Sequence, residues 1–241
     1  MNDFKWRHFT GDIILHCVRW YCKYGISYRD LQEMMEERGL SVDHTTLYRW
    51  VQDYAPEIEK RLRWYHKGGD LDGSWRVDET YVKVKGEWKY LYRAVNAAGR
   101  TIEFYLSHTR NISAATIFLK KALRAAPDWS QPHTITTDKN PTYGAAIARI
   151  NAERKEEEQL KHRTIKYLNN IIEADHGKLK RLIKPTLGFK SMKTAYATIK
   201  GFEVMRMFRK GQFDCWYHAY GVTGVTGEIR LINRQFGIYS V

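Results

Sequence analysis

Three carboxylates along the chain stand where they could hold divalent cations. Asp78 lies in an alternating segment, 75–85, that predicts a strand, and Asp138 follows another short strand. Glu173 lies in segment 167–183, whose apolar spacing predicts an amphipathic helix. Like charges that are brought together repel one another and raise their pKa values, and divalent cations relieve that repulsion. Carboxylate oxygens suit Mg²⁺ or Mn²⁺, and two such ions can drive phosphoryl transfer on a nucleic acid.

The order of the predicted elements would bring these carboxylates together. Three strands in an antiparallel meander are followed by helix, strand, helix, strand and helix, at 75–85, 87–95, 100–107, 113–126, 133–137, 141–151, 163–166 and 167–183. This is the order of a ribonuclease H-like α/β domain, in which the first and fourth strands are neighbours. Asp78 would then lie beside Asp138 at the C-terminal ends of the strands, with Glu173 laid over them. Because strand side chains alternate, Glu79 should face the opposite side from Asp78.

The helix at 167–183 also predicts the surroundings of its glutamate. At about 100° per residue, one flank is shared by four polar residues, Asn169, Glu173, His176 and Lys180. Asp175 points into the apolar stripe instead. We therefore expect it to be a partly buried carboxylate with a hydrogen-bond partner rather than a spare metal ligand. Taken alone, the segment could also be a surface helix with scattered charges.

The N-terminal 66 residues predict a small all-α domain. Three helices are expected at 12–23, 27–38 and 43–55. Ser27 and Asp30 have the spacing of a capping box, and Gly39 is suited to ending the second helix. The third helix should end before Pro56, with a separate charged helix at 57–66. Two short helices joined by a few residues that include glycine indicate a helix-turn-helix.

In a helix-turn-helix the second helix of the pair enters the major groove of DNA, and its N-terminal residues meet base edges. The candidates for base and phosphate contacts are His44, Thr45, Thr46, Tyr48 and Arg49. Threonine and arginine side chains suit such contacts. The alternative is a three-helix cap with no role in DNA binding.

The composition of the whole chain narrows the class of protein. Its 241 residues are 43% hydrophobic and 14% aromatic, which is enough to bury a core. The net charge of +13 favours a polyanion such as nucleic acid, although basic membrane-surface and ribosome-associated proteins share this property. We expect no membrane span and no signal peptide. The three cysteines, Cys17, Cys22 and Cys215, form no paired framework and indicate a reducing compartment.

Much of the positive charge lies in residues 176–210. This region holds ten Lys or Arg residues against one acid, Glu203: Lys178, Lys180, Arg181, Lys184, Lys190, Lys193, Lys200, Arg206, Arg209 and Lys210. Pro185 and Gly188 interrupt it, so a second helix is expected at about 191–210. We interpret the basic side chains, Lys190 and Lys193 among them, as a track for DNA phosphates. A solvated basic helix is the alternative.

The carboxylate spacing resembles the DDE(K) signature of bacterial transposases and retroviral integrases. Between Asp138 and Glu173 there are 34 residues, and Lys180 lies seven beyond Glu173. Several short motifs are similar to those of the insertion-sequence-six family, which includes insertion sequence twenty-six: SYRDL at 27–31, HTTLYRWV at 44–51, VDETY at 77–81, TDK at 137–139, YLNN at 167–170, EADH at 173–176 and GFKSMKTA at 188–195. The similarity covers about residues 4–210 and is less clear from 213 to 241.

This resemblance implies a DNA transposase that binds the terminal inverted repeats of an insertion sequence, cuts strand ends and joins them to double-stranded target DNA, forming cointegrates by replicative transposition. Asp78, Asp138 and Glu173 would be the catalytic triad holding two Mg²⁺ or Mn²⁺ ions, and Lys180 would contact DNA near the scissile phosphate. The chain would work as a homo-oligomer, a dimer or larger, at the nucleoid in the bacterial cytoplasm. The expected parts are a helix-turn-helix domain at 1–66, a linker at 67–73, a ribonuclease H-like catalytic domain at 74–215 and a tail of unclear role at 216–241.

Two rival functions remain open from the sequence. A helix-turn-helix transcriptional regulator would explain the N-terminal helices and the charge, but not two strand-end aspartates followed by a helix glutamate. Another ribonuclease H-like nuclease or resolvase would explain the carboxylates. The helix-turn-helix and the basic region favour the holding of specific duplex ends over degradation.

Overall fold

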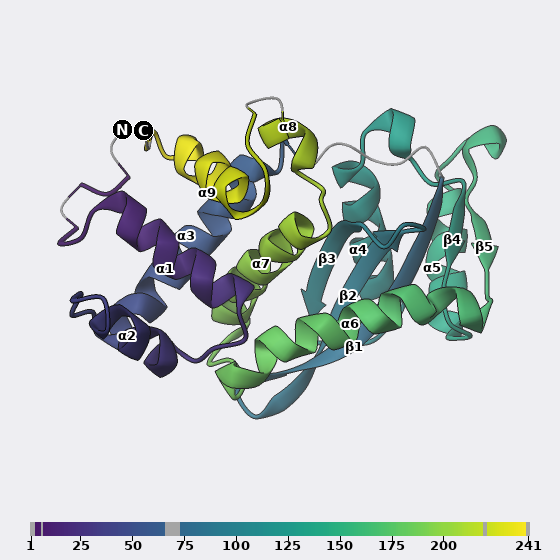
Figure 1. The fold of residues 1–241 in the computed structure, drawn as a ribbon. Coiled ribbons are helices and arrows are strands. Elements are labelled where there is room, and N and C mark those ends of the chain that lie inside the picture. Colours follow the sequence, from purple (N-terminus) through teal and green to yellow (C-terminus); the bar gives the residue numbers. More distant parts are fainter. Residues whose placement is uncertain (1–2, 6, 66–72, 219–220, 240–241) are drawn as a thin grey trace. The chain divides into compact units, whose positions relative to one another are not determined.

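The computed structural model of the chain describes residues 3–5, 7–65, 73–218 and 221–239 (Figure 1). The chain divides into two compact units, Met1–His66 together with Leu179–Val241, and Lys67–Lys178. The predicted linker at 67–73 lies outside the described residues except for Gly73. The second unit ends after Lys178, inside a helix, whereas the sequence-based boundary of the catalytic domain was placed at 215.

A five-stranded mixed sheet forms the centre of the unit Lys67–Lys178. Its strands are β1 (Ser74–Val84), β2 (Glu87–Asn96), β3 (Thr101–Ser107), β4 (Thr134–Thr136) and β5 (Lys161–Arg163). They lie in the order β3-β2-β1-β4-β5, with β1 antiparallel to β2 and parallel to β4. This is the predicted ribonuclease H-like order. The last strand begins earlier than predicted, at Lys161, because that residue is the register partner of Thr134 in β4.

Helices cover both faces of this sheet. Helices α4 (Ile112–Ala125) and α5 (Pro141–Asn151) lie on one face, and α6 (Asn170–Ile183) runs across the other (Figure 1). Three short 3-10 turns complete the unit: η1 (Asp128–Ser130), η2 (Glu156–Glu158) and η3 (Lys166–Asn169). The core between the sheet and α4 and α5 contains Val77 and Phe118, both fully buried. The strand alternation therefore turns the odd-numbered residues of β1 near Val77 toward this core.

The other unit is helical. It contains α1 (Gly11–Lys23), α2 (Tyr28–Glu36), α3 (His44–Leu62), η4 (Lys184–Thr186), α7 (Met192–Arg209), α8 (Asp214–His218) and α9 (Gly224–Gln235). The predicted capping box is present at the start of α2: the Asp30 backbone N–H donates to Ser27 Oγ at 3.1 Å, and the Ser27 N–H donates to Asp30 Oδ2 at 2.7 Å. Gly39 follows α2 with φ of 73°, a conformation that glycine adopts without a Cβ penalty.

The predicted end of the third helix at Pro56 is wrong. Helix α3 continues through Pro56 to Leu62 as one element. A proline inside a helix lacks the N–H for one backbone hydrogen bond and normally costs about 3 kcal/mol. Residues on either side of it, Tyr54 and Ile58, are 5% and 1% exposed. The buried stripe therefore continues across the proline, and its packing offsets the lost bond.

Helix α7 is more buried than a track of basic side chains or a solvated basic helix would be. Glu203 and Arg206 are 1% and 5% exposed, and the helix is buried on all sides from Gly201 to Phe208. It packs against α3 and α1 in the same unit. This packing explains why the chain after residue 178 groups with the N-terminal helices instead of with the sheet.

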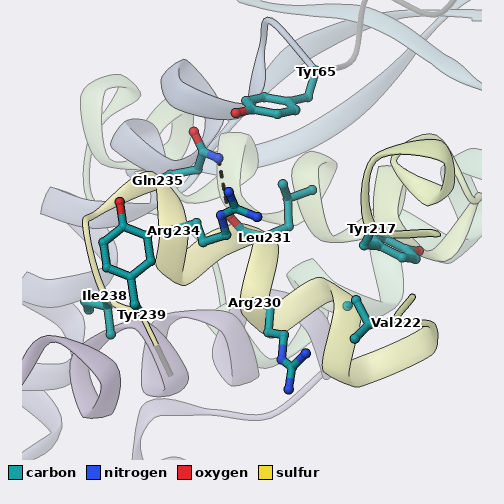
Figure 2. Close-up of a pocket in the computed structure, with 10 residues that line it drawn as sticks. Tyr65, Tyr217, Val222, Arg230, Leu231, Arg234, Gln235, Ile238 and Tyr239 are labelled. Atoms are coloured by element: carbon teal, nitrogen blue, oxygen red, sulfur yellow. Dashed lines mark hydrogen bonds between the residues drawn. The ribbon is translucent and has the colours of Figure 1, made fainter. Parts of the chain in front are cut away.

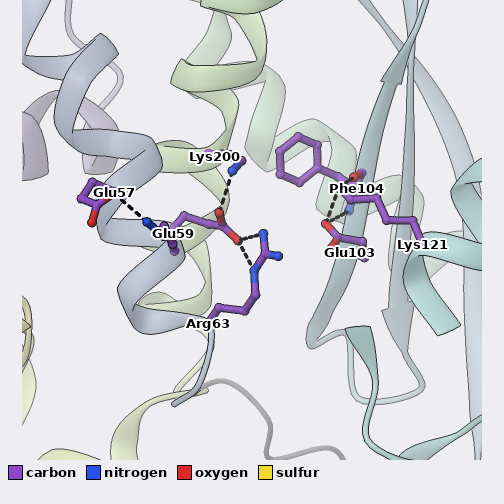
Figure 3. A network of polar contacts seen from close by, with 8 residues as sticks. Glu57, Glu59, Arg63, Glu103, Phe104, Lys121 and Lys200 are labelled. Atoms are coloured by element: carbon purple, nitrogen blue, oxygen red, sulfur yellow. Dashed lines mark hydrogen bonds and ion pairs between the residues drawn. The ribbon is translucent and has the colours of Figure 1, made fainter. Parts of the chain in front are cut away.

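An ion pair ties α7 to α3 (Figure 3). Glu59 accepts from Lys200 Nζ at 2.9 Å and from Arg63 Nη2 at 2.6 Å, and burial of Glu59 is outweighed by these cations, so its pKa is lowered. Lys200 is thus held by an ion pair within the helical unit.

In the sheet unit, Lys121 has a similar structural role, because its ammonium donates to the Phe104 carbonyl at 2.7 Å and lies 3.1 Å from Glu103 (Figure 3).

The C-terminal tail is an integral part of the helical unit. In α9, Glu228 is 4% exposed and accepts from two cations of α1, from Arg19 Nε and from Lys23 Nζ, the latter at 2.5 Å. Tyr65, Tyr217, Leu231 and Arg234 are among the residues that line a cavity of about 550 Å³ beside α9 (Figure 2). Among the described residues, no helix is long and apolar enough to cross a membrane.

The buried triad of Arg19, Lys23 and Glu228 should be a large contributor to stability. Removing one partner of a buried ion pair leaves uncompensated charge, so Glu228→Gln should lower the free energy of unfolding by about 3–5 kcal/mol in urea denaturation. The matched control is Glu153→Gln, which breaks an exposed 2.6 Å pair with Lys120. It should cost less than about 1 kcal/mol. Equal losses in the two variants would contradict the prediction.

Candidate active site

The strand register places the two aspartates side by side. Strands β1 and β4 are parallel, and Arg76 is the partner of Thr136. Asp78 lies two residues after Arg76, and Asp138 lies two residues after Thr136. The two aspartates therefore follow the last β1–β4 pair at the same level. The structure therefore brings together the two aspartates that the sequence selected.

The pKa of Asp78 indicates that the third carboxylate, Glu173, is near enough to act on it. Burial raises the pKa of Asp78 to about 7, from a usual 3.8, with further contributions from the negative charges of Glu79, Asp138 and Glu173. Each neighbour favours the protonated form because a second negative charge nearby is repelled. A carboxyl with such a pKa in a cluster of acids is a candidate functional group.

The loop after β4 holds Asp138 in place. The backbone N–H of Asn140 donates to Asp138 Oδ1 at 3.0 Å, and the Asn140 side chain in turn caps α5 through the Thr142 N–H at 3.1 Å. Thr137 Oγ1 donates to the Asp138 carbonyl at 2.8 Å and lies 2.8 Å from His162 Nε2. One carboxylate oxygen of Asp138 is therefore oriented by the start of the next helix.

Two consecutive residues of α6 dock on β1 and β2 at the level of Asp78. Asp78 is the antiparallel partner of Arg93, so both side chains lie on the same face of the sheet. Asp175 Oδ2 accepts from Arg93 Nη2 at 2.5 Å, and His176 Nδ1 lies 3.7 Å from Asp78 Oδ2. All of these side chains except Asp78 are nearly fully buried. The predicted role of Asp175 as a buried carboxylate with a hydrogen-bond partner is confirmed.

Glu173 and Lys180 are both exposed on α6. Glu173 lies in the first helical turn, where the partial positive charge of the helix N-terminus favours a carboxylate. The helix begins at Asn170, later than predicted, and the preceding residues form η3. Asn169, at the end of η3, is 1% exposed, and neither polar atom of its side chain has a hydrogen-bond partner among the described residues.

Glu79 faces away from Asp78, as the strand alternation predicts. Its carboxylate accepts from Tyr143 Oη of α5 and from Arg110 Nη2. Glu79 therefore connects β1 with α5. Its negative charge also raises the pKa of Asp78, although the two side chains lie on opposite faces of the strand. The sequence analysis did not identify Tyr143 and Arg110 as partners of Glu79. It also did not identify the contacts of Arg93 and His176, because these depend on the strand register and on the position of α6. The shared flank of Glu173 and His176 was the one available signal.

The predicted DNA-reading residues lie at the start of α3. Thr45 and Arg49 are exposed, and Thr46 is half-buried. His44 Nδ1 lies 3.2 Å from Gln32 Oε1, which ties α3 to α2. Thr45 Oγ1 donates to the N-cap Asp43 at 2.5 Å.

One basic residue of the predicted phosphate track meets this helix within the same unit. The Lys190 ammonium lies 5.7 Å from the centre of the Tyr48 ring, which packs edge-on against Tyr28 at 5.6 Å. Lys190 and Lys193 are both exposed. Arg206, by contrast, is buried and therefore unavailable to a DNA phosphate.

Comparisons with known proteins agree on one family. The DDE-domain family represented by IS240 matches residues 72–212. Two curated relatives from Staphylococcus aureus, the transposase for insertion sequence-like element IS431mec (strain Mu50) and the transposase for insertion sequence element IS257 in transposon Tn4003, are each 38% identical over 213 residues, which are 88% of this chain and 91% of the relative. The chain belongs to the insertion-sequence-six family of DDE transposases.

Solved structures similar to this transposase include the HTLV-2 integrase catalytic core domain in complex with magnesium, in trimeric and dimeric forms. The trimeric form has a TM-score of 0.43 and 18% identity, and covers 56% of this chain and 86% of that one. The dimeric form has a TM-score of 0.42 and 19% identity, with the same coverage. Family membership assigns the transposase to the polynucleotidyl transferases and separates it from the transcriptional regulators considered above.

The raised pKa of Asp78 predicts a stability that depends on pH. The folded transposase holds this proton more tightly than the unfolded chain, so without divalent cations the free energy of unfolding should fall as the pH rises from about 4 to the pKa of about 7. Asp78→Asn removes this group. The variant should therefore gain stability over the wild type across that range and reach a plateau above it, in urea denaturation with EDTA.

Added Mg²⁺ supplies a control for this prediction. The cation stabilises the charged carboxylate, so it should raise the stability of the wild type at pH 8 and leave the Asp78→Asn variant less affected. A difference between the two proteins that does not change with pH would show that Asp78 has an ordinary pKa.

Proposed function

We propose that this transposase binds the terminal inverted repeats of its insertion sequence, cuts the DNA strand ends and transfers them into double-stranded target DNA, forming cointegrates by replicative transposition. Asp78, Asp138 and Glu173 are the proposed catalytic triad. The observation that supports it most is the raised pKa of Asp78: burial is the main cause, the charge of Glu79 comes next, and the charges of Asp138 and Glu173 both add to it. The family relationship makes strand transfer on DNA the reaction that such a cluster would perform.

The donors at this site fit a divalent metal in chemical type. Three carboxylates offer the hard oxygen ligands that Mg²⁺ and Mn²⁺ prefer. The described residues contain no group of three or more histidine, cysteine, aspartate or glutamate side chains already assembled around one point. The buried Asn169 amide, whose hydrogen-bonding capacity is unmet among the described residues, is a further polar group that a ligand or water could satisfy.

In the proposed mechanism each protein group has a distinct task. A pair of Mg²⁺ or Mn²⁺ ions would, when bound, activate a water or 3′-hydroxyl and stabilise the leaving oxygen of the phosphodiester. Asp78 lies in β1 and Asp138 lies two residues after the end of the neighbouring β4, so the sheet constrains the separation of their backbones. Glu173 comes from α6, which Asp175 and His176 anchor to Arg93 and Asp78. Such anchoring limits the reorientation needed before reaction.

The helical unit would hold the DNA. The exposed Thr45 and Arg49 at the start of α3 are proposed to read bases, with His44, Thr46 and Tyr48 beside them. Lys190 and Lys193 are proposed to contact phosphates, and Lys180 to contact DNA near the scissile phosphate. Pairing two element ends requires more than one active site, so we propose a homo-oligomer, a dimer or larger, working at the nucleoid in the bacterial cytoplasm.

Removing any one charge of the triad should separate chemistry from binding. Asp78→Asn, Asp138→Asn and Glu173→Gln should each lower cleavage and strand transfer at least about a thousandfold in Mg²⁺, since charge stabilisation by bound metal is lost. Binding to duplexes that carry the terminal repeat should remain within about twofold in gel-shift assays. Strand transfer close to the wild-type rate in one variant would remove that residue from the triad.

The two proposed DNA surfaces should respond differently to mutation. Each lost phosphate contact lowers the slope of log K against log salt concentration by about 0.9, so Lys190→Gln with Lys193→Gln should lower it by about 1.8. The preference for the terminal repeat over unrelated DNA should survive in that variant. Arg49→Ala should reduce this preference instead. An unchanged salt slope in the double variant would assign the two lysines to a merely solvated surface.

A further inference from the structure

The end of the β1–β2 hairpin displays aromatic and basic side chains on one face. Lys85 and Gly86 form its two-residue turn, with φ of 51° and 81°. Tyr81 is the register partner of Tyr90, and Lys83 is the partner of Trp88. Because side chains alternate along strands, these four side chains share one face, here called the hairpin platform. Strand β3 pairs with β2 only from Tyr90 onward, so the described strands leave this end of the hairpin two-stranded (Figure 1).

The two faces of this hairpin differ sharply in burial. On the opposite face, Val82 and Val84 are each 2% exposed. On the platform, Tyr81 is 43% exposed and Trp88 is 64% exposed. Contiguous large apolar groups left in water are a characteristic of binding surfaces. Trp88 therefore contributes little to the packing of the fold.

The platform is anchored in the core of the sheet unit. Tyr92, further along the same face of β2, is 1% exposed and stacks on Phe118 of α4 at 5.7 Å. Tyr90 packs partly against the same core and lies 5.4 Å from Tyr81. Tyr92, Tyr90 and Trp88 thus occupy alternate positions on one face of β2, from the buried core to the exposed indole. A surface supported in this way loses little conformational freedom when a flat ligand stacks on it.

The charge of the hairpin favours a polyanion. Lys89 is engaged by Glu87 at 2.6 Å, and Arg110 is engaged by Glu79. Lys83 and Lys85 are exposed and have no ion-pair partner within 4 Å among the described residues. Aromatic rings with unpaired lysines beside them match the chemistry of unpaired nucleotides, because bases stack on the rings and phosphates meet the ammonium groups.

We propose that the hairpin platform binds unpaired terminal nucleotides of the DNA strand that is cut at Asp78. This inference rests on the function proposed above. Tyr81 lies three residues beyond Asp78 on the same strand, about 10 Å away at 3.3 Å per residue, but on the opposite face of the sheet, so the DNA strand would have to pass around the edge of β1 to reach it. Strand β4 ends at Thr136, so no described strand pairs with the edge of β1 beyond Arg76, and η3 is a described element that contacts β1 without pairing to it. Stacking there would keep the end of the duplex open during reaction.

The test uses the full chain and pre-cut duplexes that carry the terminal repeat, with 2-aminopurine at the three terminal positions. One duplex has these positions paired and a second has them mismatched. Trp88→Leu keeps an apolar side chain but removes the aromatic face. It should lower strand transfer of the paired end about tenfold and leave 2-aminopurine less quenched. The mismatched end should recover most of this loss, because its opening no longer needs the protein. Trp88→Phe should restore at least half of the lost activity on the paired end.

Trp64→Leu is the matched control, because Trp64 is 68% exposed and belongs to the helical unit. It should change neither readout. Equal strand transfer of both duplexes by wild type and Trp88→Leu, with unchanged fluorescence, would overturn the platform while leaving the proposed function intact. A lower oligomeric state of Trp88→Leu in sedimentation, with no change in fluorescence, would assign the face to contacts between copies and also overturn it. Failure of the wild type to join either duplex in Mg²⁺ or Mn²⁺ would instead count against the proposed function itself.

Discussion

The candidate active site depends on the contact of two adjacent residues of α6 with a pair of residues that face each other across β1 and β2. Asp78 and Arg93 face each other across β1 and β2, and Asp175 and His176 of α6 meet them. The buried Arg93–Asp175 ion pair fixes both the height and the rotation of the helix over the sheet. Since Glu173 lies two residues before Asp175, its position follows from this same contact. The site is therefore set by Asp78 together with Arg93, Asp175 and His176, of which the last three are not themselves proposed ligands.

The same arrangement makes the site costly without a counter-charge. Burial and the charges of Glu79, Asp138 and Glu173 raise the pKa of Asp78 to about 7. Arg93 and Arg110 pair with two neighbouring acids, Asp175 and Glu79, whereas Asp78 still bears repulsion from Glu79, Asp138 and Glu173. A divalent cation would relieve that repulsion directly. In this way an unfavourable interaction in the protein alone would become affinity for a cation in the proposed site.

Local sequence patterns predicted most helices and strands correctly. They failed where the structure of a residue depends on residues that are distant in the sequence. The face occupied by Glu79 and the buried position of Asp175 follow from periods of 2 and 3.6 residues, and the strand order follows from the succession of the elements. Pro56 and Arg206 were misjudged because each depends on its neighbours in space. The packing of α3 carries the helix through the proline, and α7 is enclosed by α1 and α3. The partners of Glu228 lie more than 200 residues away in sequence, at separations of 209 and 205, so no local pattern could announce them.

Strand β1 illustrates how one alternating sequence can serve three tasks. Its even-numbered face presents Asp78 to α6, and its odd-numbered face buries Val77 and directs Glu79 toward Tyr143. Further along, the odd face emerges from the core and carries Tyr81. A shift of register by one residue would exchange all of these side chains between faces. The pairing with β2 therefore constrains the core, the carboxylate and the exposed aromatic surface together, and a change that slipped this register would disrupt all three at once.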